Sequence, residues 1–133
     1  MLERIIVSMV LIITLQGADF GVYSYNEVTQ TADYANDSGV TVDMIKEVTV
    51  EKQNGQNVQY LVCFRLNDIG AERNSAFSKK YVGKRIAIMV NGMVVSSPKI
   101  IVGSRDDFAI QMDKFEWGED FRTVFKDKLR VIE

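Results

Sequence analysis

An Asn-Gly pair between two apolar runs constrains the fold of this chain more than any other feature. Asn91-Gly92 joins the segments 85–90 and 93–100, and both segments are rich in Ile, Val and Met. A type I′ turn requires a positive φ at both central residues, and Asn and Gly adopt it most readily. The pair therefore predicts a hairpin with a two-residue loop.

This loop assigns each side chain of the hairpin to one of two faces. Val90 should lie opposite Met93, and Ile88 opposite Val95, because side chains alternate along a strand. One face is then apolar and is expected to join the core: Ile86, Ile88, Val90, Met93 and Val95. The other face is mixed: Arg85, Ala87, Met89, Val94 and Ser96.

Composition indicates one globular domain and disfavours several functions. The chain has 133 residues, of which 47% are apolar, and a formal net charge of −2. This balance does not favour a nucleic-acid partner. The chain has no histidine, the usual general base and commonest metal ligand, and no cofactor is indicated. Its single cysteine, Cys63, lies within a strand-like run and is expected to be a small buried side chain.

The first 41 residues divide into two segments before the domain at 42–133. Residues 1–18 start with charges and continue with an apolar run from Ile5 to Leu15, which is too short to span a bilayer and is typical of a secretory signal peptide. The alternative is a buried first strand. Residues 19–41 are interpreted as an N-terminal arm, either lying on the domain or mobile.

A second hairpin is predicted upstream of the first. The segments 42–51 and 57–66 alternate in hydrophobicity around a turn at 53–56. A three-residue loop, 53–55, places Val50 opposite Val58 and Val48 opposite Tyr60, so that apolar residues share one face. A two-residue loop would instead pair apolar with acidic positions.

Helices are predicted after each group of strands. Asn67 or Asp68 caps a helix that continues to about Lys80 and ends near Gly83. Its expected apolar side is Ile69, Ala76, Phe77 and Tyr81. After Pro98 and a turn at 103–107, a short strand at 108–112 precedes a helix over 117–131, with apolar Phe121, Val124, Phe125 and Leu129. The order β-β-α-β-β-β-α predicts an α+β fold, in which an antiparallel sheet of two hairpins plus a short strand carries two helices on one face.

The segment from Leu66 to about Phe115 resembles the head subdomain of the periplasmic domain of SecD, a bacterial protein-export subunit. The block VGKRIAIMVNGMVVSSPKI at 82–100 carries the resemblance, because its Gly-Lys, Ala-Ile, Gly, Val-x-Ser and Pro-x-Ile elements match without a gap. Asn91 stands where that family usually has Asp, Ser97 where it has Ala, and Met112 where it often has Gly.

The resemblance implies a free-standing SecD-like head outside the cytoplasm, periplasmic or secreted. In the family this domain is associated with capturing polypeptide that emerges from the membrane channel. SecD's transmembrane helices and base subdomain have no counterpart in this sequence, so proton-driven export is not implied. The mature chain is expected to lack a membrane span, and its oligomeric state stays open.

Candidate chemistry is sparse. The carboxylates of Asp106-Asp107 lie in a predicted turn, while Glu116, Glu119 and Asp120 begin a helix, where acidic residues complement the helix dipole. Ser96 and Ser97 have only Lys84 and Lys99 as conceivable bases. Gly83-Lys84-Arg85 lacks the remaining residues of a phosphate loop. We therefore expect no enzymatic activity.

The predicted binding residues are Met89, Met93 and Val94, near the tip of the Asn91-Gly92 hairpin. Methionine is overused on surfaces that accept varied apolar partners. The resemblance favours a module for extended or unfolded polypeptide. The alternative is a dedicated binder of one folded partner, such as an immunity or inhibitor protein.

Overall fold

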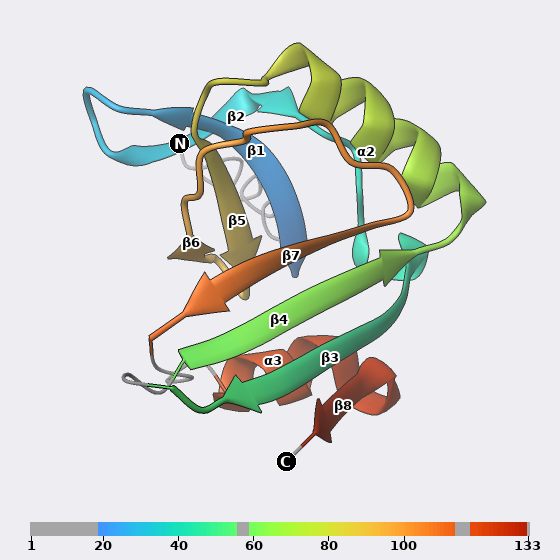
Figure 1. Cartoon of the computed structure of the whole chain (residues 1–133). Coiled ribbons are helices and arrows are strands. Elements are labelled where there is room, and N and C mark those ends of the chain that lie inside the picture. Colours follow the sequence, from blue (N-terminus) through green and yellow to red (C-terminus); the bar gives the residue numbers. More distant parts are fainter. Residues whose placement is uncertain (1–18, 56–58, 114–117, 133) are drawn as a thin grey trace, which may run out of the picture.

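The computed structural model describes residues 19–55, 59–113 and 118–132, and within these ranges the strands form two four-stranded sheets (Figure 1). Sheet A has the order β2-β1-β5-β6 and sheet B the order β7-β4-β3-β8. Sheet A comprises β1 (Phe20–Asn26), β2 (Thr31–Asp37), β5 (Ile86–Val90) and β6 (Met93–Ser96). Sheet B comprises β3 (Ile45–Gln53), β4 (Gln59–Leu66), β7 (Asp107–Met112) and β8 (Leu129–Ile132).

Two α-helices lie at opposite ends of the molecule in Figure 1: α2 (Asp68–Lys80) and α3 (Gly118–Phe125). Two 3-10 turns, η1 (Val42–Met44) and η2 (Lys126–Lys128), precede β3 and β8. The α+β class and both predicted helices are confirmed. The strands, however, form two sheets in place of the single sheet expected, and each sheet combines two strands that precede α2 with two that follow it.

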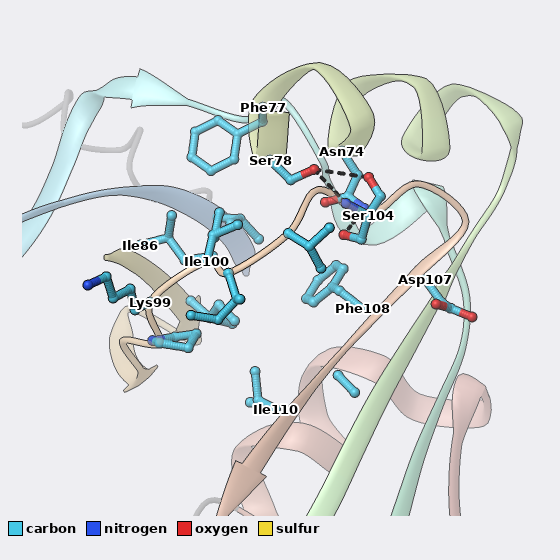
Figure 2. Close-up of a pocket in the computed structure, with 16 residues that line it drawn as sticks. Asn74, Phe77, Ser78, Ile86, Lys99, Ile100, Ser104, Asp107, Phe108 and Ile110 are labelled. Carbon is cyan, nitrogen blue, oxygen red and sulfur yellow. Dashed lines mark hydrogen bonds between the residues drawn. The ribbon is translucent and has the colours of Figure 1, made fainter. Parts of the chain in front are cut away.

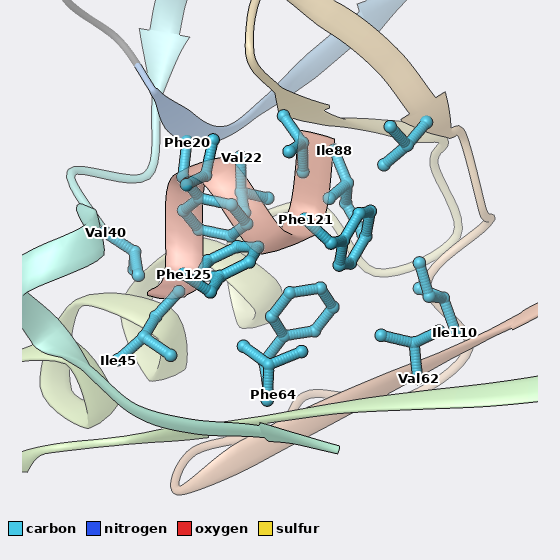
Figure 3. Close-up of a cluster of buried hydrophobic side chains, with 14 of the residues drawn as sticks. Phe20, Val22, Val40, Ile45, Val62, Phe64, Ile88, Ile110, Phe121 and Phe125 are labelled. Carbon is cyan, nitrogen blue, oxygen red and sulfur yellow. The ribbon is translucent and has the colours of Figure 1, made fainter. Parts of the chain in front are cut away.

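The core fills the space between the sheets (Figure 3). Phe20 and Val22 of β1 and Ile88 of β5 face Phe64 of β4, whose ring centroid lies 5.5 Å from that of Phe20. Helix α3 completes this cluster with Phe121 and Phe125, both almost fully buried. Each sheet thus contributes one apolar face, as strand alternation requires.

Residues 19–41 are not an arm outside the domain. Phe20–Asn26 is a central strand of sheet A, antiparallel to β5, with Phe20 opposite Val90. Thr31–Asp37 is an edge strand of the same sheet. Alternating Phe20, Val22 and the β-favouring tyrosines explain why this stretch forms strands. Residues 1–18, predicted as a signal peptide, lie outside the described residues.

The Asn91-Gly92 turn is confirmed, with φ of 53° and 81° at its two residues. Val90 pairs with Met93 and Met89 with Val94, but a bulge then places Ser96 opposite Ile88. Val95, the extra residue, is buried in the core.

The other hairpin keeps its predicted faces and changes its register. Val48 lies opposite Phe64 and Val50 opposite Val62, so the loop is longer than three residues. A shift by an even number of residues leaves every side chain on its face, which explains why the faces were correct.

The last helix is shorter than expected. It ends at Phe125, and Lys126 has a φ of 52°, which an α-helix cannot accommodate. Leu129–Ile132 then forms β8, parallel to β3, with Leu129 opposite Val48. Of the predicted apolar residues, Phe121, Val124 and Phe125 are nevertheless buried, whereas Leu129 is half-buried.

Helix α2 begins and ends as predicted, but its buried side differs. The Asn67 side chain accepts a hydrogen bond of 2.9 Å from the Gly70 N–H, and Gly83 has a φ of 86°. Ile69 is 55% exposed and Ala76 is exposed, so they do not form an apolar face. The buried side consists of Gly70, Ala71, Asn74, Ser75, Phe77 and Ser78.

Candidate functional site

The three predicted binding residues do not form an open surface. Met89 lies on the expected face of β5, opposite the main core, but is only 5% exposed and packs with Tyr23, Ala32 and Ala87. Val94 is half-buried against this cluster, and Met93 is half-buried at the turn. The expectation that Met89 is accessible is wrong, because both faces of β5 are covered.

An apolar cavity of about 320 Å³ opens elsewhere, between sheet A and β7 (Figure 2). Its walls come from β1, β5, α2, β7 and the segment 98–104. Most of the lining is aliphatic or aromatic, including Val22, Phe77, Ile88, Ile100, Phe108 and Ile110. Its volume lies at the lower end of the range that ligand-binding pockets occupy.

Apolar side chains continue from the cavity to the surface. Ile101 and Val102 line the cavity and are each 76% exposed. Adjacent exposed apolar residues are a feature of surfaces that bind partners. The sequence contains the signal for this site in the run Ile100-Ile101-Val102, which follows Pro98 and cannot all be buried in a loop.

Helix α2 holds this loop in place through hydrogen bonds. The Asn74 amide donates to the Ser104 hydroxyl at 3.0 Å and to the Arg105 carbonyl at 3.1 Å. The Ser78 hydroxyl donates to the Ser104 carbonyl at 3.0 Å and accepts from the Ser104 N–H at 2.9 Å. These buried polar contacts explain why α2 has small polar residues on its packed side (Figure 2).

The carboxylates singled out from the sequence do not converge. Asp106 is exposed, 3.7 Å from Arg105, and Asp107 points away from the cavity in Figure 2. Asp120 accepts a hydrogen bond from the Asn91 amide at 2.8 Å, while Glu119 lies in the first turn of α3. Glu116 lies outside the described residues. Within the described ranges, no three acidic, Cys or His residues are placed to hold a metal ion.

Ser97 is held by contacts with Arg85. Arg85 donates to the Ser97 carbonyl at 3.0 Å and to its hydroxyl at 2.9 Å. No hydrogen bond joins Ser96 or Ser97 to Lys84 or Lys99 in the part of the chain that the structure describes. Among the described residues, neither of these lysines is therefore placed to activate Ser96 or Ser97.

Cys63 lies on the outer face of sheet B, opposite Thr49 on β3 and Ala109 on β7. It is half-buried, not fully buried as the sequence indicated. Burial raises the pKa of its thiol, the Asp107 and Glu47 carboxylates raise it further, and Arg65 opposes them. A raised pKa leaves little thiolate at neutral pH, which argues against a reactive cysteine.

Comparison with known structures identifies the fold. The chain is similar to a crystal structure of SecDF in a super-membrane-facing form, with a TM-score of 0.54 and 14% identity. That match covers 81% of this chain and 18% of the other. A structure of the membrane component SecDF that enhances protein export matches at a TM-score of 0.50 and 13% identity, over 80% of this chain and 59% of the other. The chain thus spans less than two thirds of either SecDF structure.

No curated protein matches this chain. No helix in the described ranges is long and apolar enough to cross a membrane.

The match to a protein family is more direct evidence than the similarity to these structures. The sequence matches the SecDF P1 head subdomain over residues 21–113, which include β1 and β2 as well as the segment that carried the resemblance. The chain therefore belongs to the SecDF P1 head subdomain family.

Proposed function

We propose that this chain is a non-catalytic module that binds extended or unfolded polypeptide outside the cytoplasm. The observation that supports this function is the apolar cavity between sheet A and β7, with exposed Ile101 and Val102 at its rim. An unfolded chain exposes apolar side chains that such a cavity can bury. The similar SecDF structure belongs to a membrane component that enhances protein export, which fits a polypeptide ligand.

A substitution at the rim tests this function. Ile101→Asp should weaken binding of a permanently unfolded polypeptide, such as a reduced and carboxymethylated protein, by roughly tenfold, since one apolar side chain would no longer be buried. Val28→Asp is the matched control, because Val28 is 94% exposed at the β1–β2 turn and does not line the cavity. Titration calorimetry measures both.

Three results would argue against the proposal. An equal loss of affinity in both variants would indicate a general charge effect. No loss of affinity in either variant would exclude the cavity rim as the binding site. Tight binding of one folded protein, with no affinity for several unrelated unfolded ones, would favour the dedicated binder instead.

Export through a signal peptide at residues 1–18 is the second part of the proposal. Protein made in its own host should then begin near Asp19 when its amino terminus is sequenced. β1 begins at Phe20, so cleavage there would leave sheet A intact. A secreted or periplasmic pool that retains Met1 would contradict it.

A further inference from the structure

Strand β7 forms one edge of sheet B, and the strand beside it is β4. We propose that this edge adds an extended polypeptide segment as a further strand, whose alternate side chains enter the apolar cavity. This inference rests on the function proposed above and specifies how the polypeptide is held.

The register of β7 shows which backbone groups face the free edge. The Leu66 N–H donates to the Asp106 carbonyl at 2.9 Å, so residues 66 and 106 form a hydrogen-bonded pair. In an antiparallel ladder such pairs alternate with non-bonded ones, so Phe108 and Ile110 bond to β4. Asp107, Ala109 and Gln111 therefore direct their N–H and C=O groups outward.

These outward groups have no backbone partner within the described residues, because none of the backbone hydrogen bonds outside the strand ladders involves them. Unpaired edge groups are a template for another strand. β7 contains no proline and spans six residues, so its three alternate outward residues, Asp107, Ala109 and Gln111, are all available for pairing.

The edge borders the cavity. Asp107, Phe108, Ala109 and Ile110 all line it, although only Phe108 and Ile110 direct their side chains between the sheets. Asp107 and Ala109 therefore line the cavity with backbone. An added strand would place the residues opposite Phe108 and Ile110 in the cavity and those opposite Ala109 on the outer face of sheet B.

The charge of Asp107 indicates which side chains the bound polypeptide should carry. Asp107 is exposed on the outer face and makes no ion pair among the described residues. Its neighbour on β4, Arg65, is bound to Glu47 at 2.9 Å. A lysine or arginine opposite Asp107 would supply the missing partner. The preferred segment thus alternates apolar residues with polar ones that include a basic residue.

The β6 edge of sheet A is less suitable. β6 has four residues, and the following Ser97 carbonyl already accepts a hydrogen bond from Arg85. Pro98 lacks an N–H. Strand addition is therefore expected at β7 and not at β6.

Backbone N-methylation separates strand addition from side-chain binding. The probe is the blocked nonapeptide Thr-Val-Thr-Val-Lys-Val-Thr-Val-Thr, in which valines alternate with polar residues and the central lysine can lie opposite Asp107 in either strand direction. It is made in three forms: unmodified, N-methylated at the lysine and the second threonine (the polar set), or N-methylated at the last two valines (the valine set). Strand pairing uses the N–H groups of only one of these sets. One methylated peptide should therefore bind at least tenfold more weakly, and the other should keep its affinity.

The set that matters also reports the direction of the added strand. In antiparallel pairing, the peptide residues opposite the outward positions of β7 form the hydrogen bonds, and these are the polar ones. Lost affinity on methylating the polar set would therefore mean antiparallel pairing. Lost affinity on methylating the valine set would mean parallel pairing.

The outcomes distinguish the two proposals. Equal affinity of both methylated peptides would overturn strand addition and leave polypeptide binding in place. No binding of the unmodified peptide or of unfolded proteins would overturn both.

Two variants test the edge itself. Ala109→Pro removes an outward N–H without removing a bond to β4, and should weaken the peptide roughly tenfold. Ala109→Val keeps the N–H at the same exposed position and should bind normally. Unchanged affinity in a folded Ala109→Pro protein would contradict the proposal, and the methylated peptides decide it if that variant does not fold.

The charge preference has its own control. Replacing the peptide's lysine with glutamate should weaken binding at low salt, and Asp107→Asn should reduce that difference. An unchanged difference would exclude Asp107 as the partner of the basic residue.

Discussion

Ile88 and Met89 are adjacent on β5 and point to opposite faces, yet 0% and 5% of their surfaces are exposed. Each aspartate introduced here would bury an unpaired carboxylate. We expect Ile88→Asp and Met89→Asp both to lower the free energy of unfolding by at least about 3 kcal/mol, or to prevent folding. Urea titration followed by circular dichroism measures this.

Met89→Leu is the control, because it preserves volume and should cost less than about 1.5 kcal/mol. Val94 is only half-buried, so Val94→Asp should cost less than Met89→Asp. A Met89→Asp protein as stable as the wild type would show that the outer face of sheet A is accessible, and Met89 would return as a binding residue.

At the level of elements, local signals predicted one turn and one helix start correctly, but not the loop of the β3–β4 hairpin. Asn91-Gly92 predicted the β5–β6 turn, and Asn67 predicted the start of α2. The bulge at Val95 could not be predicted, because it depends on which side chain the core accepts. The sequence predicts helix where β8 forms, because the pairing of β8 with β3 is a tertiary contact between residues far apart in the sequence.

Helix α2 shows why the candidate site was missed. Its packed side contains Gly70 because a Cβ there would lie 2.9 Å from Met44 Cβ. It contains Asn74 and Ser78 because they bind the loop that frames the cavity. A search for apolar periodicity overlooks such a helix, and the cavity itself forms only when two sheets and this loop meet.

The outer faces of the two sheets carry a buried tyrosine, Tyr23, and a half-buried cysteine, Cys63, whose ionisation should affect the stability of the whole molecule in alkali. Burial raises the pKa of Tyr23 on sheet A, with Asp37 and Tyr34 adding to the effect, and burial also raises the pKa of Cys63 on sheet B. In each case the folded protein holds its proton more tightly than the unfolded chain. The stabilisation is therefore complete below the pKa of the unfolded chain and is lost as pH rises through the folded value.

Stability should consequently fall as pH rises above about 8.5, where an unfolded cysteine ionises, and fall further above about 10, where an unfolded tyrosine does. Urea midpoints measured between pH 7 and 11 test this. Cys63→Ala should reduce the first loss and leave the second, whereas Tyr23→Phe should do the reverse. A Cys63→Ala protein that loses stability as steeply as the wild type between pH 8 and 9.5 would show that the thiol does not contribute. Because the pKa values of both groups are raised above ordinary values that already exceed 8, neither variant should alter the response between pH 6 and 7.5.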